Sequence, residues 1–439
     1  MKPTALVVGS TLAGLTTALR LGQRGYAVTL IEHAEPRDHI SARHTSSDHA
    51  IPLVLMGGHT ATRALLETLG TSNDVQLDDQ IGFELLLSDH RLIRLRRPPL
   101  PAPLHALAGL AIFAGMPARD RWRFLMWVER TWEQDPALQV DLDSHTAEAW
   151  LRGIGQSEYA RAHIWSPLSR FLLGDDVNTV SAAVLLTTLM RHFLSSRSHS
   201  QLAIPLLSMD QLLHEPMRQA LLDMGGTIQT EFVDRIAFNM QRVTGIQPMT
   251  DNLRVADWYI VALPHQCVPT LLPERLLTRF SYFQHIGELA DTPAVAVHLW
   301  IDEAVQSPRL ILLAGRTFHW ICLKRVADTR QTHAVLMMTG PSGSDRSDED
   351  LLKSAEEDLR TALPAMSKSR RISHHIVRAP RASLSMRPGM TAHRPLQQSP
   401  FPNLFFAGEW TDTGIAATVE SAVVSGERCA HAILDKSVE

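Results

Sequence analysis

The chain has 439 residues, of which 45% are apolar, and this length predicts two domains or one large composite fold. A formal net charge of −4 argues against a surface that attracts nucleic acid as a whole. Three widely spaced cysteines, without a CxxC pair, argue against a disulfide framework and a structural zinc site. Only five lysines occur, none of them between residues 3 and 323, which excludes a P-loop or Schiff-base lysine in that part.

The first ten residues predict a buried strand. They lack the basic region, long apolar core and small-residue cleavage site of a signal peptide. No uncharged apolar run reaches about 18 residues without helix breakers, so we expect no transmembrane helix. We therefore expect a cytoplasmic protein, with a peripheral position on the inner face of the membrane as the alternative.

A strand, a tight turn, a helix and a second strand open the chain. Residues 4–8 are a continuous apolar run, residues 15–22 have helical spacing, and residues 27–31 are apolar again and lead into Glu32. This acid lies 18 residues after the last turn glycine, which suits a dinucleotide whose ribose contacts the carboxylate. The candidate phosphate turn consists of Gly9, Ser10, Thr11, Leu12, Ala13 and Gly14. A βαβ unit with a purely structural role is the alternative.

The turn departs from the G-x-G-x-x-G pattern at its middle glycine, which is Thr11 here. That glycine normally lets the backbone approach the phosphates, so Thr11 should push a pyrophosphate outward or impose a different turn. Its hydroxyl could compensate in part by donating a hydrogen bond to a phosphate.

Residues 98–116 are apolar but interrupted by prolines and glycines. Six arginines flank them, namely Arg94, Arg96, Arg97, Arg119, Arg121 and Arg123. An apolar patch between arginines suits a channel mouth that rests on a membrane surface. The alternative is a helical hairpin packed into the core with a solvated arginine face.

Further along, residues 209–224 predict an amphipathic helix that ends at Gly225 and Gly226. Residues 227–230 resume as a strand, which is followed by Val233, and residues 256–264 predict another strand. Near the end of the chain, residues 403–408 predict a strand, residues 409–414 a polar loop, and residues from 416 onward a helix.

The array A-G-E-W-T-x-T-G-x-A-A-T-x-E-x-A-x-x-S-G over residues 407–426 resembles the closing flavin motif of the superfamily of phytoene desaturases and flavin amine oxidases. The resemblance implies that FAD is the cofactor. It also implies that Glu409, after Gly408, meets the ribityl–phosphate region of FAD. The helix N-terminus near Ala417, Thr418 and Val419 would face the flavin N1/O2 edge, where it stabilises negative charge on the reduced ring.

The same resemblance implies an α/β fold with a discontinuous, Rossmann-like FAD-binding domain of the glutathione-reductase type. This domain would comprise residues 1–75, 203–265 and 396–439, and Val233 would bracket the adenine. Residues 76–202 and 266–395 would form an α+β substrate-binding domain.

Five stretches, in order along the chain, look like hydroxysqualene dehydroxylase, the squalene-associated FAD enzyme of hopanoid biosynthesis. They are residues 100–110, 146–151, 156, 164–168 and 204–207. The implied substrate is a lipophilic isoprenoid, and the implied reaction is hydride transfer from reduced FAD to an allylic carbon as the hydroxyl leaves. A dehydrogenating desaturase would reverse the hydride direction. An amine oxidase-like enzyme is less favoured, because the strand predicted over residues 294–301 lacks the lysine that amine oxidases commonly hold near the flavin.

Two family motifs are altered. The usual G-G-R after the second strand is replaced by residues 39–43, so only Arg43 could still neutralise the phosphates. An N-G-Q-H segment of the squalene branch is replaced by residues 48–52. These departures leave three alternatives: altered FAD binding, a different substrate, or a non-catalytic relative with impaired FAD binding.

Other candidate sites carry little support in the sequence. His374 and His375 are adjacent in a predicted strand and point to opposite faces, so we expect no metal site. His105, His163 and Asp210 are more plausible as structural residues than as catalytic acids. The sequence thus assigns no catalytic residue, electron partner or oligomeric state.

Overall fold

The computed structural model describes residues 2–33, 51–52, 54–78, 81–131, 140–249, 252–343 and 345–438. Arg43 and nearly all of the two altered motifs lie outside these residues. Within the described helices, none is both long and apolar enough to cross a membrane.

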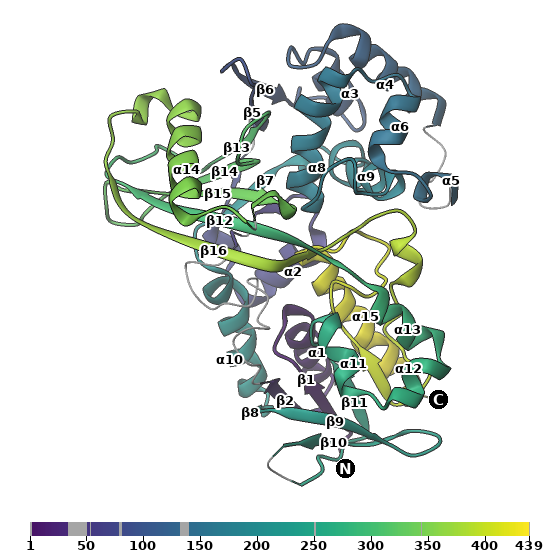
Figure 1. The fold of residues 1–439 in the computed structure, drawn as a ribbon. Coiled ribbons are helices and arrows are strands. Elements are labelled where there is room, and N and C mark those ends of the chain that lie inside the picture. The colour runs from purple at the N-terminus through teal and green to yellow at the C-terminus, as the bar shows by residue number, and fades with distance from the viewer. Residues whose placement is uncertain are drawn as a thin grey trace.

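A parallel sheet forms the lower part of the molecule in Figure 1. In the described residues it has five strands, in the order β17 (Leu404–Phe406), β11 (Trp258–Val261), β1 (Thr4–Val8), β2 (Ala27–His33) and β8 (Thr227–Glu231). The central strands are continuous apolar runs because both faces are covered: Val7 packs on the side of the flanking helices, whereas Val8 packs in the cluster that contains Val233 and Ile246. These strands come from all three segments expected to bind FAD, which agrees with the predicted Rossmann-like fold. The division into domains at particular residues stays a prediction.

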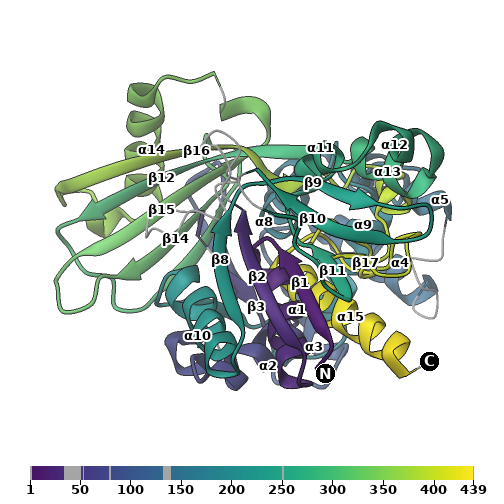
Figure 2. The same ribbon diagram turned by 90° about the horizontal axis from the view of Figure 1, so that it is seen from below.

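Four helices flank this sheet, namely α1 (Leu12–Gln23), α2 (Thr60–Leu69), α10 (Glu215–Asp223) and α15 (Val419–Val438). The first and last of them lie side by side (Figure 2). Gly426 permits this contact, because a Cβ atom there would lie 2.5 Å from the carbonyl oxygen of Ala13. The first and the last helix of the described chain, α1 and α15, are therefore packed against each other next to the candidate phosphate turn.

A second sheet, largely antiparallel, contains seven strands among the described residues. Their order is β16 (Arg371–Leu384), β12 (Asp291–Ile301), β15 (Thr332–Thr339), β14 (Trp320–Arg325), β13 (Arg309–Leu313), β5 (Ile81–Leu86) and β6 (Leu92–Arg96). Alternation along β12 separates the faces: Val295 and Val297 pack with α14 (Asp348–Ala362), whereas Ala294 and Ala296 belong to the core on the other side. One face of this sheet is thus covered by a helix and the other faces the interior.

Helices occupy the upper right of Figure 1. They are α3 (Leu104–Ala111), α4 (Ala118–Thr131), α5 (Val140–Asp143), α6 (Ala147–Gly153), α7 (Glu158–Ala160), α8 (Ser166–Leu173) and α9 (Ala182–Leu189). A small three-stranded sheet has the order β3 (Leu55–Met56), β7 (Leu202–Pro205) and β4 (Val75–Asp78). A two-stranded sheet consists of β9 (Val233–Phe238) and β10 (Val243–Pro248). The last short helices are α11 (Val268–Leu271), α12 (Glu274–Arg279) and α13 (Ser281–Glu288).

Two sequence expectations change in detail. The helix predicted from residue 416 begins at Val419, because the Thr418 hydroxyl accepts a hydrogen bond from the Ser421 N–H and caps the helix. The helix predicted over 209–224 is an α-helix only from Glu215 and is preceded by a π-helical turn over Asp210–His214.

The segment over residues 98–116, with its flanking arginines, has features of a core-packed hairpin and of an exposed apolar surface. Its helices pack partly into the core, yet several large apolar side chains are exposed, including Leu104, Ile112 and Trp122. Of the six arginines, Arg97 is buried, and others contact protein groups. Arg94 pairs with Glu84, and Arg121 and Arg123 donate to the backbone carbonyls of Ala111 and Gly155. Arg96 and Arg119 are exposed.

Candidate functional site

The phosphate turn lies at the carboxyl end of β1 and leads into α1. Gly9 has a φ of +109°, and a Cβ atom there would lie 2.3 Å from the carbonyl oxygen of Ala262. A Cβ atom at Gly14 would lie 2.2 Å from the carbonyl oxygen of Gly9. Both glycines are therefore required by the backbone geometry, because they let the turn pack against the residue that follows β11. The N-terminus of α1 consequently lies at the carboxyl end of the parallel strands.

Thr11 is the N-cap of α1. Its hydroxyl accepts a hydrogen bond from the Gly14 N–H at 3.2 Å and donates to the carbonyl of Ala262 at 2.9 Å. The hydroxyl proton is thus committed to the protein backbone, and the expectation that it donates to a phosphate is not met in this structure. Thr11 imposes a capped turn in which the side chain stabilises the helix start, an effect of about 1 kcal/mol.

Glu32 lies at the end of β2, at the same edge of the parallel sheet as the turn. Its carboxylate forms an ion pair with Arg218 of α10, and the Thr230 hydroxyl lies 3.5 Å from its other oxygen. A ribose at this position would have to share the carboxylate with Arg218. Val233 is buried in the same hydrophobic cluster as Val8 and Ile31. Arg43 lies outside the described residues.

Gly408 and Glu409 follow β17. A Cβ atom at Gly408 would lie 2.3 Å from the indole nitrogen of Trp410, and the Gly408 N–H donates to the Ser425 hydroxyl at 3.0 Å. The carbonyl of Glu409 accepts from Arg394 at 2.8 Å. Within the described part of the chain, no side-chain hydrogen bond or ion pair engages the Glu409 carboxylate. Its backbone is therefore fixed, and its side chain has no such partner among the described residues.

A buried arginine that the sequence analysis missed holds this loop. The Arg394 guanidinium donates to backbone carbonyls of the loop, namely those of Glu409, Trp410, Thr411 and Ile415. It also donates to the Ser421 hydroxyl at the start of α15. Burial lowers the pKa of Arg394 to about 10, so the group stays charged at neutral pH. No local motif marks this arginine, because its partners are carbonyl oxygens rather than particular side chains.

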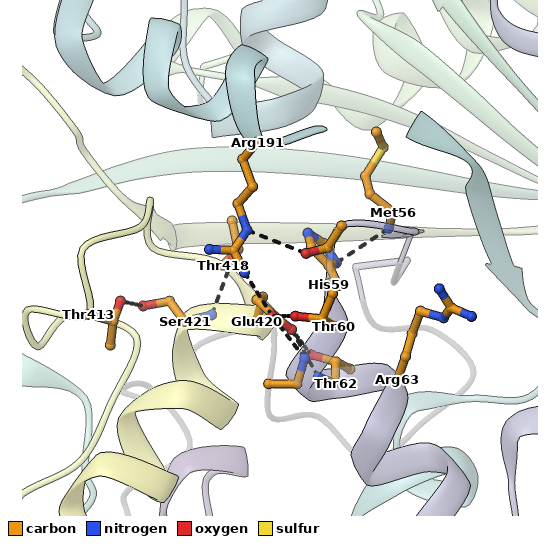
Figure 3. Close-up of polar contacts among 12 residues, drawn as sticks. Met56, His59, Thr60, Thr62, Arg63, Arg191, Thr413, Thr418, Glu420 and Ser421 are labelled. Carbon is orange, nitrogen blue, oxygen red and sulfur yellow. Dashed lines mark hydrogen bonds and ion pairs between the residues drawn. The ribbon is translucent and has the colours of Figure 1, made fainter. Parts of the chain in front are cut away.

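A second missed residue, Glu420, joins α15 to α2. Its buried carboxylate accepts hydrogen bonds from the N–H groups of Ala61 and Thr62, at 3.0 and 2.9 Å, and so caps the N-terminus of α2 (Figure 3). Arg191 reaches the same carboxylate at 3.1 Å from the opposite side. Glu420 is part of the sequence array quoted above, but its partners lie more than two hundred residues earlier in the chain.

A cavity of about 170 Å³ adjoins this arrangement. Ala417, Thr418 and Val419 line it on the side of α15, and the face of the large sheet opposite α14 lines the other side. Most of the lining is apolar, with contributions from Met56, Phe171, Leu172, Ala294, Trp320 and Met337. The described lining contains polar groups such as His59, Arg170, His192 and Thr339, but no lysine and no carboxylate.

The histidines at the cavity are neutral at physiological pH. His59 and His192 meet edge to face, with ring centroids 5.2 Å apart. Burial, assisted by the Arg191 charge, lowers the pKa of His59 to about 3. Burial lowers the pKa of His192 to about 2, with further contributions from His59 and Arg191. These imidazoles can exchange hydrogen bonds with a bound molecule without adding positive charge to the cavity.

Behind Arg170, a third buried imidazole belongs to His319. Its Nδ1 accepts a hydrogen bond from the Thr339 N–H at 2.9 Å, and burial together with the Arg170 charge lowers its pKa to about 3. Arg170 is held on its other side by Asp176 at 2.8 Å.

The candidate acids from the sequence do not line the described cavity. His105 is buried in α3, His163 stacks on Tyr159, and Asp210 pairs with His214. Their placement agrees with the structural roles that were expected. His374 and His375 lie in β16, as predicted for adjacent strand residues.

These pKa shifts predict a pH-dependent stability. Below pH 6.5 the unfolded chain protonates its histidines, whereas the folded chain keeps His59, His192 and His319 neutral, so the free energy of unfolding falls as the pH falls. Each imidazole contributes up to about 1.4 kcal/mol per pH unit. Urea denaturation between pH 6.5 and 5 should therefore show a shallower pH dependence for His192→Asn than for the unmodified chain. The exposed control His90→Asn should keep the full slope, and equal slopes in all three proteins would contradict the assignment.

Comparisons with known proteins place the chain in a family. The family model described as flavin containing amine oxidoreductase matches residues 12–434. The 15-cis-phytoene desaturase of Synechococcus elongatus is 24% identical over 466 aligned positions, covering 99% of this chain and 96% of that protein. The zeta-carotene desaturase of Synechocystis is 23% identical over 482 positions, covering 98% and 96%.

Solved structures share the fold at low identity. A putrescine oxidase variant superposes with a TM-score of 0.74 at 16% identity, and covers 99% of both chains. Cyclohexylamine oxidase from Brevibacterium oxydans superposes with a TM-score of 0.71 at 17% identity, over the full length of both chains. These findings confirm the superfamily, the fold class and the cofactor that the sequence implied, and they favour an enzyme over the non-catalytic relative. The chain belongs to the flavin-containing amine oxidoreductase family and is a FAD-dependent oxidoreductase.

Proposed function

We propose that this enzyme acts on a lipophilic isoprenoid. The observation that carries the proposal is the apolar cavity at the N-terminus of α15, whose described lining contains neutral imidazoles but neither lysine nor carboxylate. An amine substrate would favour a carboxylate or another anionic partner for its ammonium group, and the cavity offers none among these residues. The carotenoid desaturases named above are relatives over nearly the whole chain, which supports the same substrate class.

The residues present fit FAD. Gly9 and Gly14 pack too closely against backbone carbonyls for a Cβ atom and so form a tight turn at the start of α1. The helix α15 begins at Val419, and the Glu409 carboxylate has no hydrogen-bond or ion-pair partner among the described residues. We assign the pyrophosphate to the turn from Gly9 to Gly14, the ribityl–phosphate region to Glu409, and the flavin edge to the helix start at Ala417–Val419. The role of Arg43 at the phosphates remains a prediction from the sequence alone. We likewise keep Val233 beside the adenine as a prediction.

Within this substrate class, we propose a reductive dehydroxylation of the hydroxysqualene dehydroxylase type. Bound FAD, once reduced, would supply hydride to an allylic carbon as the protonated hydroxyl leaves as water, and the flavin would return to its oxidised form. The chain supplies a largely apolar cavity, with Arg170 at its lining, and two uncharged hydrogen-bonding groups, His59 and His192, that can orient a hydroxyl. The second candidate is a dehydrogenating desaturase, which is favoured by the names of the curated relatives.

We also propose that the segment around α3 and α4 rests on a membrane surface, from which such a substrate would be drawn. Ile112 and Trp122 are 62% and 65% exposed, an arrangement that leaves large apolar side chains in water. Arg96 and Arg119, which flank this segment in the sequence, are exposed and suit anionic headgroups.

The cofactor assignment predicts that Glu409→Ala lowers FAD retention by about ten-fold or more, because the carboxylate would lose its hydrogen bonds to the cofactor. The thermal stability of the protein freed of FAD should stay unchanged, since no described residue depends on this side chain. Released flavin after gel filtration measures retention, and the exposed Glu67→Ala serves as the control. Full retention in Glu409→Ala would refute the assignment.

The substrate assignment predicts that the anaerobically reduced protein converts hydroxysqualene to squalene with reoxidation of its flavin. In parallel, the oxidised protein is assayed on phytoene with a quinone acceptor, and on putrescine with oxygen. Met337→Lys should lower isoprenoid turnover at least about ten-fold by placing a charge in the cavity, whereas the fully exposed Met240→Lys should not. Desaturated phytoene without squalene would establish the second candidate, and amine turnover alone would reject both.

The membrane proposal predicts co-sedimentation with vesicles that contain phosphatidylglycerol. Replacing both Ile112 and Trp122 by Asp should weaken binding about ten-fold or more, because apolar area would no longer be buried in the interface. Val255→Asp, at an equally exposed position of the parallel-sheet region, is the matched control. Equal binding of all three proteins would contradict this surface.

A further inference from the structure

Two histidines and a glutamate converge where α13 meets the 3₁₀ turn Met390–His393. His285 and Glu288 are three residues apart in α13, so both lie on one face of the helix. His393 approaches that face from the turn, and the rings of His285 and His393 lie 4.9 Å apart. Each of the three side chains offers a ligand atom, and these atoms lie within 4.8 Å of one another.

One candidate ligand atom of this cluster, Nδ1 of His393, has no hydrogen bond. Nδ1 of His393 is shielded from solvent and has no hydrogen-bond partner, and the nearest oxygen of Glu288 lies 3.5 Å away. A buried imidazole nitrogen without a partner is a costly arrangement that a bound cation would relieve.

We propose that His285, Glu288 and His393 bind a divalent first-row transition metal ion, with zinc the preferred occupant. Two imidazole nitrogens and one carboxylate oxygen are a ligand set that zinc takes in proteins, with a water molecule at the fourth position. Tetrahedral ligands around zinc are closer together than 4.8 Å, so the three side chains would have to draw together on binding, and the Glu288 side chain is exposed. Magnesium and calcium prefer oxygen ligands and should not compete.

This site is separate from the cavity but adjoins the loop that follows β17. His393 precedes Arg394, whose guanidinium holds the backbone of residues 409–415. A second contact already joins α13 to this segment, because the Tyr282 hydroxyl donates to the Leu396 carbonyl at 2.6 Å. A metal ion would add a cross-link between α13 and the segment that carries Arg394, which is a structural role independent of the substrate.

The experiment uses the full chain with its FAD, first treated with a chelator and then titrated with zinc chloride by calorimetry. Cobalt(II) gives an independent readout, because tetrahedral nitrogen–oxygen coordination produces visible absorption bands. We expect one equivalent to bind, and we expect the thermal unfolding temperature to rise with zinc. Magnesium chloride should produce neither effect.

The variants His285→Ala and His393→Ala should each weaken zinc binding by at least about ten-fold and abolish the thermal shift. Because His393 adjoins Arg394, the flavin spectrum of each variant verifies that the fold is retained, and His285→Ala alters a different element. The matched control is His374→Ala with His375→Ala, an exposed pair in β16. Zinc binding that is absent, or that is equal in the cluster variants and the control, would overturn the proposal.

Discussion

The buried carboxylate of Glu420 is the interaction on which the arrangement of the site depends. A carboxylate that is 1% exposed is stable only when its oxygens are fully paired, and here the partners come from two other regions of the chain. The α2 N-terminus and Thr62 satisfy one side, and Arg191 satisfies the other. The helix that carries Glu420 begins at Val419 and is capped by Thr418, beside the cavity, so the pairing fixes where the positive end of that helix points.

Arg394 is a buried cation that fixes the loop before α15, as the buried anion Glu420 fixes the helix itself. Its guanidinium has no carboxylate partner among the described residues and is solvated by backbone carbonyls of the loop before α15. The loop is thereby given one conformation although it contains little regular structure. Together, a buried anion at the first turn of α15 and a buried cation beneath the preceding loop define the position of Glu409 and of the helix start.

The sequence predicted those parts that arise from local pattern. Continuous apolar runs marked the parallel strands, and the array around Glu409 marked the loop and helix that face the cavity. It could not predict partnerships between distant residues. Thr11 looked like a damaged phosphate contact, whereas its hydroxyl caps α1 and bonds to Ala262, which comes about 250 residues later. Glu32 looked like a free ribose ligand, whereas Arg218 of α10 holds it. The sequence pattern did not mark Arg394 or Arg191 as site residues, because the carbonyl and carboxylate groups that they bind come close to them only in the folded chain.

The order of strands in the parallel sheet has a consequence for biosynthesis. The first strand pairs with residues 258–261, and that strand in turn needs residues 404–406 to cover its other edge. During translation the first strand therefore waits with an open edge until residues 258–261 have left the ribosome, and the growing sheet keeps that side open until nearly the whole chain has done so. Contacts of such long sequence separation make folding slow, and unpaired apolar strands invite association with other chains in the meantime. Producing this protein in the cell should thus depend on chaperones, and on growth temperature, more than its stability once folded would indicate.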